Sequence, residues 1–137
     1  MKPHRMSYLI IASLLIGAGL LSRSPILGLP PIVAKYAGSV IWGGMVYFAW
    51  AVVRPEQHAR KRAIIAAVIA AAVEFSQLVH TEWLDAIRRT TIGVLLIGRF
   101  FSWWDIAAYL VGIAIAAMLE RMIVRSDPAS SAAGVSK

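Results

Sequence analysis

The 137-residue sequence contains no cysteine and only three histidines. Without cysteine there is no disulfide framework, no thiolate metal site and no cysteine nucleophile. His4, His58 and His80 are scattered along the chain instead of forming the closely spaced set typical of a metal site. The sequence also lacks a phosphate-binding Walker loop and a Rossmann glycine fingerprint. We therefore predict neither a metal nor a cofactor.

Charged residues are scarce too: they make up 15% of the chain, whereas hydrophobic residues make up 59%. A soluble domain contains about 25% charged residues. The mean hydropathy is +0.70, and the apolar residues form four long blocks, at residues 6–22, 36–53, 63–80 and 103–119. Each block approaches the roughly 20 residues with which an α-helix crosses a bilayer. The sequence predicts an all-α, integral membrane four-helix bundle, with residues 1–121 as a single transmembrane domain.

Basic residues outnumber acidic ones, 14 to 7, and give a formal net charge of +7. They are spread over several segments instead of forming one basic stripe, so we expect no nucleic acid partner. The largest groups lie at the two termini and between the second and third blocks: Lys2, Arg5, Arg54, Arg60, Lys61, Arg62, Arg121, Arg125 and Lys137. Because an excess of Lys and Arg marks the cytoplasmic side, we expect both termini there. Residues 122–137 are predicted to be a disordered cytoplasmic tail, because the SDPASSAAGVSK segment is small and polar and lacks periodicity.

The connection between the third and fourth blocks differs from an ordinary loop. Thr81 can cap a short helix that begins at Glu82 and has an apolar side. The following IGVLLIG segment is apolar but too short to span, which predicts an interfacial or short re-entrant segment. The aromatic residues of FFSWWD are typical of the level at which a membrane helix is anchored.

Small and polar residues at helical spacing indicate which helix faces pack together in a membrane. In chain order these faces are Ser13 and Gly17; Ser39, Gly43 and Tyr47; Ala67, Ala71, Glu74, Leu78 and Thr81; and Asp105, Ala108, Tyr109, Gly112 and Ala116. The third and fourth faces both combine small with polar residues. We therefore expect these two faces to meet.

Glu74 lies just past the middle of the third block, toward the outer side of the membrane. A charged residue at the centre of a membrane helix costs at least about 2.5–3.5 kcal/mol on insertion scales, so this carboxyl should face the bundle. One interpretation is functional: Arg88 and Arg99 can bind a phosphate or carboxylate through their planar guanidinium groups. The predicted outward-facing polar pocket then consists of Glu74, Gln77, Asp85, Arg88, Arg99, Asp105 and Tyr109.

A structural interpretation of the same residues stays open. Asp85 precedes Arg88 by three positions, an ordinary acid-first pairing on a helix. Ser102 and Asp105 fit the capping box that begins a helix. Tyr109 can bond to a neighbouring helix, and Glu74 with Gln77 can hold helices together, with Arg99 as a partner. No residue is predicted to be catalytic.

Two stretches of the sequence resemble known families. VEFSQ, followed by GRFFSWWDIAAYLVG, is similar to the E-x-x-Q … R-x-x-S-x-x-D-x-x-x-N-x-x-G pattern of VanZ-like membrane proteins. The segments KYAGSVIWGGMVYF, VEFSQLVHTEWLDAIRRTTIG and SWWDIAAYLVG resemble more closely a related family of small bacterial four-span proteins whose function is not established (domain of unknown function 2809). This similarity extends from Tyr8 to Leu119.

The resemblance implies a multi-pass protein of the bacterial inner membrane, with its polar motif residues toward the outer side. It also implies a role near the cell envelope, because the founding VanZ-like protein is linked to glycopeptide resistance. The motif residues carried over are Glu74, Gln77, Arg99, Asp105 and Gly112. Tyr109 departs from the pattern, which has asparagine there.

Three classes of function follow from these observations. The favoured class is an envelope-associated protein that binds a lipid headgroup, a cell-wall precursor or an amphipathic compound in the outward-facing pocket. The second is a small-solute or ion transporter subunit, possible as an oligomer, in which Glu74 carries a proton or cation. The third is an intramembrane enzyme acting on a lipid-linked substrate, for which the sequence shows no arranged nucleophile, metal or base.

Overall fold

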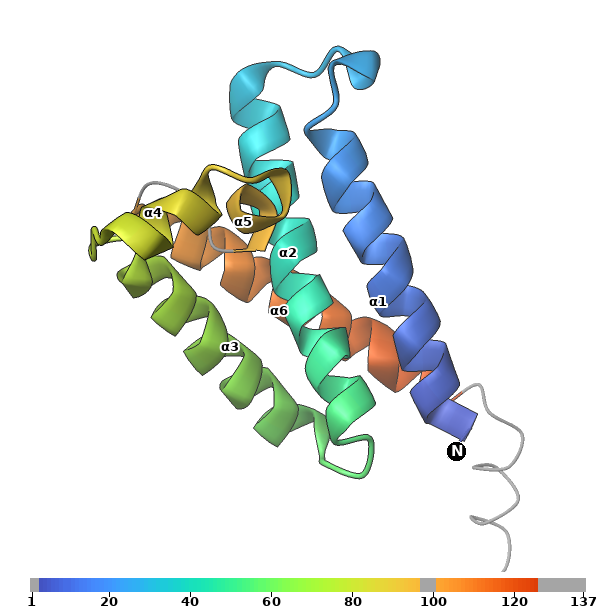
Figure 1. The fold of residues 1–137 in the computed structure, drawn as a ribbon. Helices are drawn as coiled ribbons and strands as arrows, with labels where there is room; N and C mark the ends of the chain where they lie inside the picture. The colour runs from blue at the N-terminus through green and yellow to red at the C-terminus, as the bar shows by residue number, and fades with distance from the viewer. Residues whose placement is uncertain (1–2, 97–100, 126–137) are drawn as a thin grey trace, which may run out of the picture.

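The computed structural model describes residues 3–96 and 101–125, and every regular element in these residues is a helix (Figure 1). Six α-helices and one 3₁₀ helix follow one another along the chain. Their bounds are α1 Pro3–Ser22, η1 Pro25–Leu27, α2 Pro31–Val53, α3 Ala59–Ser76, α4 Glu82–Arg88, α5 Thr91–Leu96 and α6 Trp103–Arg125. The predicted all-α class is confirmed.

Three of these helices are long and apolar enough to cross a membrane: the segments His4–Ser22, Pro31–Val53 and Trp103–Arg125. The predicted third block forms α3, which is 18 residues long and includes four charged side chains, Arg60, Lys61, Arg62 and Glu74. With these four charges, α3 is not among the helices that are long and apolar enough to cross a membrane. Among the described residues, three of the four predicted spans, residues 6–22, 36–53 and 103–119, therefore correspond to helices that are long and apolar enough to cross a bilayer.

Proline and local polar contacts account for the helix limits that differ from the predicted blocks. α2 begins at Pro31, earlier than the predicted residue 36, because proline is favoured in the first turn of a helix. α3 begins inside the basic run and ends at Ser76 instead of residue 80. α6 continues through the apolar residues Met122–Val124 to Arg125, so residues 122–125 are helical and do not belong to a disordered tail. The remainder of that tail lies outside the described residues.

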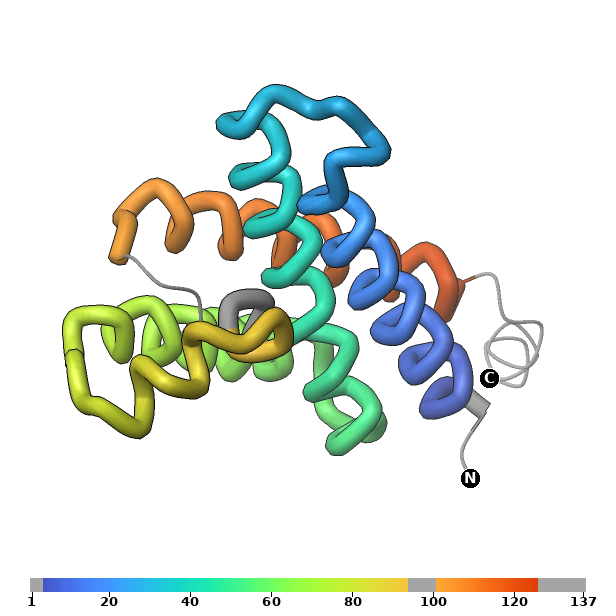
Figure 2. The backbone as a smooth tube through the Cα atoms, turned by 45° about the horizontal axis from the view of Figure 1, so that its top comes forward, coloured from blue at the N-terminus to red at the C-terminus, as the bar shows by residue number. Residues whose placement is uncertain are grey.

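α2 is the central helix of the bundle. It packs against α1, α6 and α3, and α6 also packs against α3. α1 and α2 lie side by side and antiparallel, while α6 crosses behind α2 (Figures 1 and 2). The start of α1, the 54–58 connection and the end of α6 lie at one end of the molecule, which we call the basic end. The η1 helix and α4 lie toward the other end.

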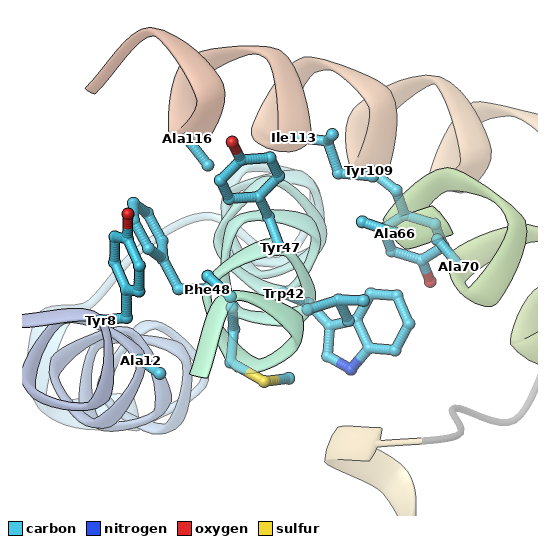
Figure 3. Packing of buried hydrophobic residues seen from close by; sticks show 13 residues of the cluster. Tyr8, Ala12, Trp42, Tyr47, Phe48, Ala66, Ala70, Tyr109, Ile113 and Ala116 are labelled. Atoms are coloured by element: carbon cyan, nitrogen blue, oxygen red, sulfur yellow. The ribbon is translucent and has the colours of Figure 1, made fainter. Parts of the chain in front are cut away.

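The core is built around aromatic side chains of α2. Figure 3 shows Trp42, Tyr47 and Phe48 between the neighbouring helices, with Tyr8 from α1 and Tyr109 from α6. The ring centroids of Trp42 and Tyr109 are 4.7 Å apart. These rings pack beside small buried residues on the neighbouring helices: Ala12, Ala66, Ala70, Ala108 and Ala116.

The predicted packing faces are correct for α2 and α6 and wrong for α1 and α3. All residues predicted for the faces of α2 and α6 are buried. Ser13 and Gly17 of α1 are exposed instead, and Ser13 bonds to its own helix at Leu9 O. On α3 the buried residues are Arg62, Ala66, Ala70 and Glu74, not the set with Ala67, Ala71, Leu78 and Thr81. Alanine occurs on both sides of α3, so its position alone does not identify the packed face.

Candidate functional site

Glu74, near the end of α3, lies inside the bundle and is 0% exposed. Its Oε1 accepts a hydrogen bond from the backbone N–H of Ser102 at 2.7 Å. Its Oε2 accepts bonds from the Tyr109 hydroxyl at 2.8 Å and from the Gln77 side-chain amide at 3.2 Å. These four residues form the Glu74 cluster, which ties the end of α3 to the start of α6. The prediction that this carboxyl avoids the acyl chains is confirmed.

Asp105 lies one helical turn before Tyr109 and connects α6 to α2. Its Oδ1 accepts a hydrogen bond from the Ser39 hydroxyl at 3.2 Å. The ammonium of Lys35 lies 3.9 Å from its Oδ2. The Asp105 carboxyl is buried, whereas the Lys35 side chain is 52% exposed. Lys35 therefore extends from a buried acid to the surface of the molecule.

The predicted capping box between Ser102 and Asp105 does not form. In such a box, the side chain of the third helical residue accepts the N–H of the cap residue. Here the Ser102 N–H donates to Glu74, and the Asp105 carboxyl turns to Ser39 and Lys35. Two bonds between helices thus replace one local bond, so both residues contribute to assembly of the bundle.

Asp85 and Arg88 lie on α4 and hold the turn that follows α3. The Arg88 guanidinium donates to the backbone oxygens of Ser76 and Val79, and it contacts Asp85 Oδ1 at 3.1 Å. The predicted helical pairing of Asp85 with Arg88 is confirmed. Helix ends leave backbone carbonyl groups without intrahelical donors, and Arg88 supplies donors here. These three bonds all lie in the α3–α4 region.

The structure therefore brings together Glu74, Gln77, Tyr109 and, through α6, Asp105. Asp85 and Arg88 form a separate group, and Arg99 lies outside the described residues. Thr81 precedes α4 as predicted, but its side chain makes no capping bond. Ser39 and Lys35 join the site without having been predicted as site residues. Lys35 could have been found from its spacing, because it lies one turn before Ser39 on the buried face of α2.

A shallow, widely open apolar groove, lined by residues of α2 alone, lies beside Lys35. It has a volume of about 540 Å³ and is lined by Ile32, Val33, Tyr36, Ala37, Val40 and Ile41. The Tyr36 ring lies 5.5 Å from the Lys35 ammonium. A half-exposed cation thus lies next to one end of a groove without charged lining residues.

A second buried polar group, the Arg62 cluster, lies at the basic end and was missed by the sequence reasoning. It consists of Tyr8, Tyr47, Arg62 and Glu120. Arg62 Nη1 and the hydroxyls of Tyr47 and Tyr8 all donate to the Glu120 carboxylate, the last at 2.7 Å. The guanidinium carbon lies 5.2 Å and 5.6 Å from the centroids of the Tyr8 and Tyr47 rings. One residue from each of α1, α2, α3 and α6 therefore meets at this point.

The Arg62 guanidinium also orders the connection between α2 and α3. Its Nη2 donates to the backbone oxygens of Arg54, Pro55 and Gln57 at 3.2, 3.1 and 2.9 Å. The sequence of α6 could have indicated this cluster. Continuing the face of Gly112 and Ala116 by one more turn reaches Glu120, an acid on a packed face.

The described residues offer hydrogen-bonded carboxylates but no set of three His, Asp or Glu side chains that could hold a metal ion. The buried acids of the Glu74 and Arg62 clusters accept bonds from protein donors. Their geometry is that of groups that connect helices. Lys35, which contacts the buried Asp105, is 52% exposed and lies beside the apolar groove.

Comparison with known proteins identifies the family but no structural relative. No solved structure matches the chain. A family model described as "Protein of unknown function (DUF2809)" matches residues 28–113. This range includes Glu74, Asp105, the α2 groove and Gly112, whereas Tyr8 and Glu120 of the Arg62 cluster fall outside it. Because the match covers more than half of the sequence, the chain belongs to the DUF2809 family of proteins of unknown function.

Proposed function

We propose that this chain is a bacterial inner-membrane protein of the cell envelope that binds an amphipathic molecule with an anionic headgroup. The headgroup lies at Lys35 and the apolar part in the α2 groove. The observation that carries the proposal is the position of the half-exposed Lys35 ammonium beside an apolar groove of about 540 Å³. Apolar sites with a few convergent polar groups are typical of small-molecule binding. A lipid with an anionic headgroup or a lipid-linked cell-wall precursor combines an anionic group with an apolar part.

The side-chain distribution of α3 supports a fourth membrane span. Ile64 and Val68 are 57% and 63% exposed, whereas Arg62 and Glu74 are 0% exposed. A helix on a soluble bundle has the opposite distribution, with polar residues outside. In lipid, exposed apolar side chains and buried, bonded charges are favourable. α3 then crosses the bilayer together with α1, α2 and α6.

The charge distribution supports an orientation with the basic end in the cytoplasm. Arg54, Arg60 and Lys61 lie there, together with Arg5 at the start of α1. By the positive-inside rule, this end faces the cytoplasm. Lys35 and its groove then lie in the outer half of the membrane. The motif similarity to VanZ-like proteins supports a role at the envelope.

Glu74 has a positioning role in this proposal. Both of its carboxyl oxygens accept bonds from the protein, and the side chain is fully buried. It fixes α3 on α6, which in turn presents Asp105 to Lys35. A transporter that uses Glu74 would need a water path to this carboxyl, so binding at Lys35 fits the geometry better.

Photo-cross-linking tests the proposal. The purified protein in neutral detergent is illuminated with a phospholipid that carries an anionic headgroup and a diazirine in its acyl chain, and labelled peptides are identified by mass spectrometry. We expect label concentrated in residues 32–41 and displaced by unlabelled anionic lipid. Ala37→Trp fills the groove and should reduce the labelling. Lys35→Gln should reduce it about fivefold, because one basic residue contributes about 1 kcal/mol to binding of anionic lipid.

The matched control is Lys61→Gln, which removes an exposed lysine at the basic end. It should leave labelling of residues 32–41 unchanged. Label spread evenly over the exposed faces of α1 and α6 would show that the groove is ordinary lipid-facing surface. Equal labelling in the wild type and Lys35→Gln would exclude Lys35 as the headgroup contact.

A further inference from the structure

A second pocket lies at the basic end, far along α2 from the groove beside Lys35. It has a volume of about 360 Å³ and lies between the start of α1, the 54–58 connection, the start of α3 and the last turns of α6. Its lining includes His4, Gln57, His58, Ala59, Arg121 and Arg125. Three regions that are distant in sequence, residues 4–8, 55–59 and 120–125, thus contribute to one concave surface.

The charges that line this pocket are predominantly positive. Its charged lining residues are Arg121, Arg125 and Glu120. Its acidic lining residue among the described side chains is Glu120, whose carboxylate already accepts bonds from Arg62, Tyr8 and Tyr47. No acidic partner of Arg121 or Arg125 occurs within residues 3–96 and 101–125. The two arginines are therefore available to an external anion.

The start of α3 forms part of the wall of the same pocket. His58 and Ala59, the cap and the first residue of α3, both line it. The first N–H groups of a helix have no acceptor within the helix, and they carry the positive end of its dipole. The side chain of the cap residue makes no capping hydrogen bond to the first turn, and the first turn contains no acidic side chain. The local sequence of α3 thus does not neutralise its positive end.

We propose that this pocket binds a phosphate group. The two arginines offer guanidinium donors that match phosphate oxygens, and helix N-termini favour phosphate through their N–H groups. The phosphate belongs either to the headgroup of an anionic lipid or to a soluble phosphate compound. The lining residues of this pocket differ from those of the groove beside Lys35, so this inference does not depend on the proposed function.

Native mass spectrometry of the full chain, released from a neutral detergent, tests the inference. The protein is titrated with short-chain phosphatidic acid, and short-chain phosphatidylcholine serves as the zwitterionic reference. We expect saturable binding of phosphatidic acid. The double variant Arg121→Gln/Arg125→Gln should raise its Kd about tenfold or more, because two cations near the headgroup are lost. Ala59→Leu keeps every charge but reduces the room in the pocket, and it should also raise the Kd.

The matched control is Arg60→Gln/Lys61→Gln, which removes two exposed charges from the same end of the molecule without touching the pocket lining. It should change the Kd by less than about threefold. Competition with inorganic phosphate distinguishes the two sources: displacement of the lipid supports a soluble phosphate compound, and no displacement supports a lipid headgroup. Equal losses in the two double variants, an unaffected Ala59→Leu, or binding that does not saturate would overturn the inference.

Discussion

Glu74 and Glu120 are both buried carboxylates, but their partners differ in charge. Glu120 accepts bonds from the Arg62 guanidinium and two tyrosine hydroxyls. Glu74 accepts bonds from neutral donors, namely Ser102 N–H, Tyr109 and Gln77. In a low-dielectric interior an uncompensated polar group costs much more than a paired one. The stability of the Glu74 cluster therefore depends on every one of its hydrogen bonds.

Removal of the Glu74 carboxyl should destabilise the contact between α3 and α6. Glu74→Ala leaves three buried donors without their acceptor, and we expect a loss of about 3 kcal/mol or more in the free energy of unfolding. Glu74→Gln keeps one acceptor oxygen, so its loss should be about 1–2 kcal/mol. Thermal unfolding in detergent, followed by circular dichroism, measures both.

Glu82→Gln is the control for this comparison, because Glu82 is an exposed acid on α4. Its unfolding temperature should equal that of the wild type. An unchanged unfolding temperature in Glu74→Ala would mean that the carboxyl does not hold the two helices together.

At the residue level, the sequence predicted the placement of Glu74 but not that of Arg62. An acid in the middle of an apolar block has one favourable direction, toward the bundle, and the burial of Glu74 confirms it. Arg62 is the last of three consecutive basic residues, which we expected to act as an orientation signal. Which of the three turns inward depends on the rotation of α3, and both possible faces of that helix contain alanine.

At the level of elements, the crossing of α2 and α6 depends on two glycines that bring the backbones into contact. A Cβ atom at Gly43 would overlap the backbone of Tyr109, and one at Gly112 would overlap the backbone oxygen of Val40. Small residues at helix interfaces permit this approach in membrane proteins. Because α6 presents both Tyr109 and Asp105, the crossing also positions the polar groups near Lys35.

Gly112→Ala should weaken the bundle by about 2 kcal/mol or more, since backbone atoms cannot move aside as a flexible side chain can. Gly43→Ala should have a similar effect. Gly17→Ala on α1 is the matched control, because its Cβ would meet no atom within 4 Å. It should be neutral or stabilising, since alanine favours a helix by about 1 kcal/mol over glycine. The unfolding temperatures of the three variants in detergent test this ranking, and equal losses in all three would contradict it.

The sequence predicted the long helices and the short α4, while the helix limits and the packing faces of α1 and α3 required tertiary information. Apolar blocks of span length predict helices because lipid leaves the backbone no other partner. The end of α3 at Ser76 was not predictable in this way. It coincides with the bond from Arg88 to the Ser76 carbonyl, made by a residue on the next helix. Similarly, the N–H of Ser102 is satisfied by Glu74 of another helix instead of a local cap.

At the level of the whole molecule, the distribution of side chains is the reverse of that in a soluble bundle. Large apolar residues are exposed on every long helix, for example Leu14, Ile32, Val68 and Met118. Buried positions include the charged side chains of Arg62, Glu74, Asp105 and Glu120. Lipid can cover the exposed apolar surface, and each buried charge has polar partners inside. In the proposed topology, the two proposed anion sites lie toward opposite ends of the bundle and face opposite leaflets.

The proposed topology is testable by labelling single cysteines, since the natural sequence contains none and gives no background. Leu29→Cys lies between η1 and α2, Glu56→Cys between α2 and α3, and Val79→Cys after α3, all at exposed positions. Sealed spheroplasts are treated with a membrane-impermeant maleimide. If four helices span with the basic end inside, positions 29 and 79 react, whereas position 56 reacts only after the membrane is opened. Protection of position 79 together with position 56 would show that α3 does not cross. Reaction of position 56 alone would show the reverse orientation, which would place Lys35 at the inner leaflet.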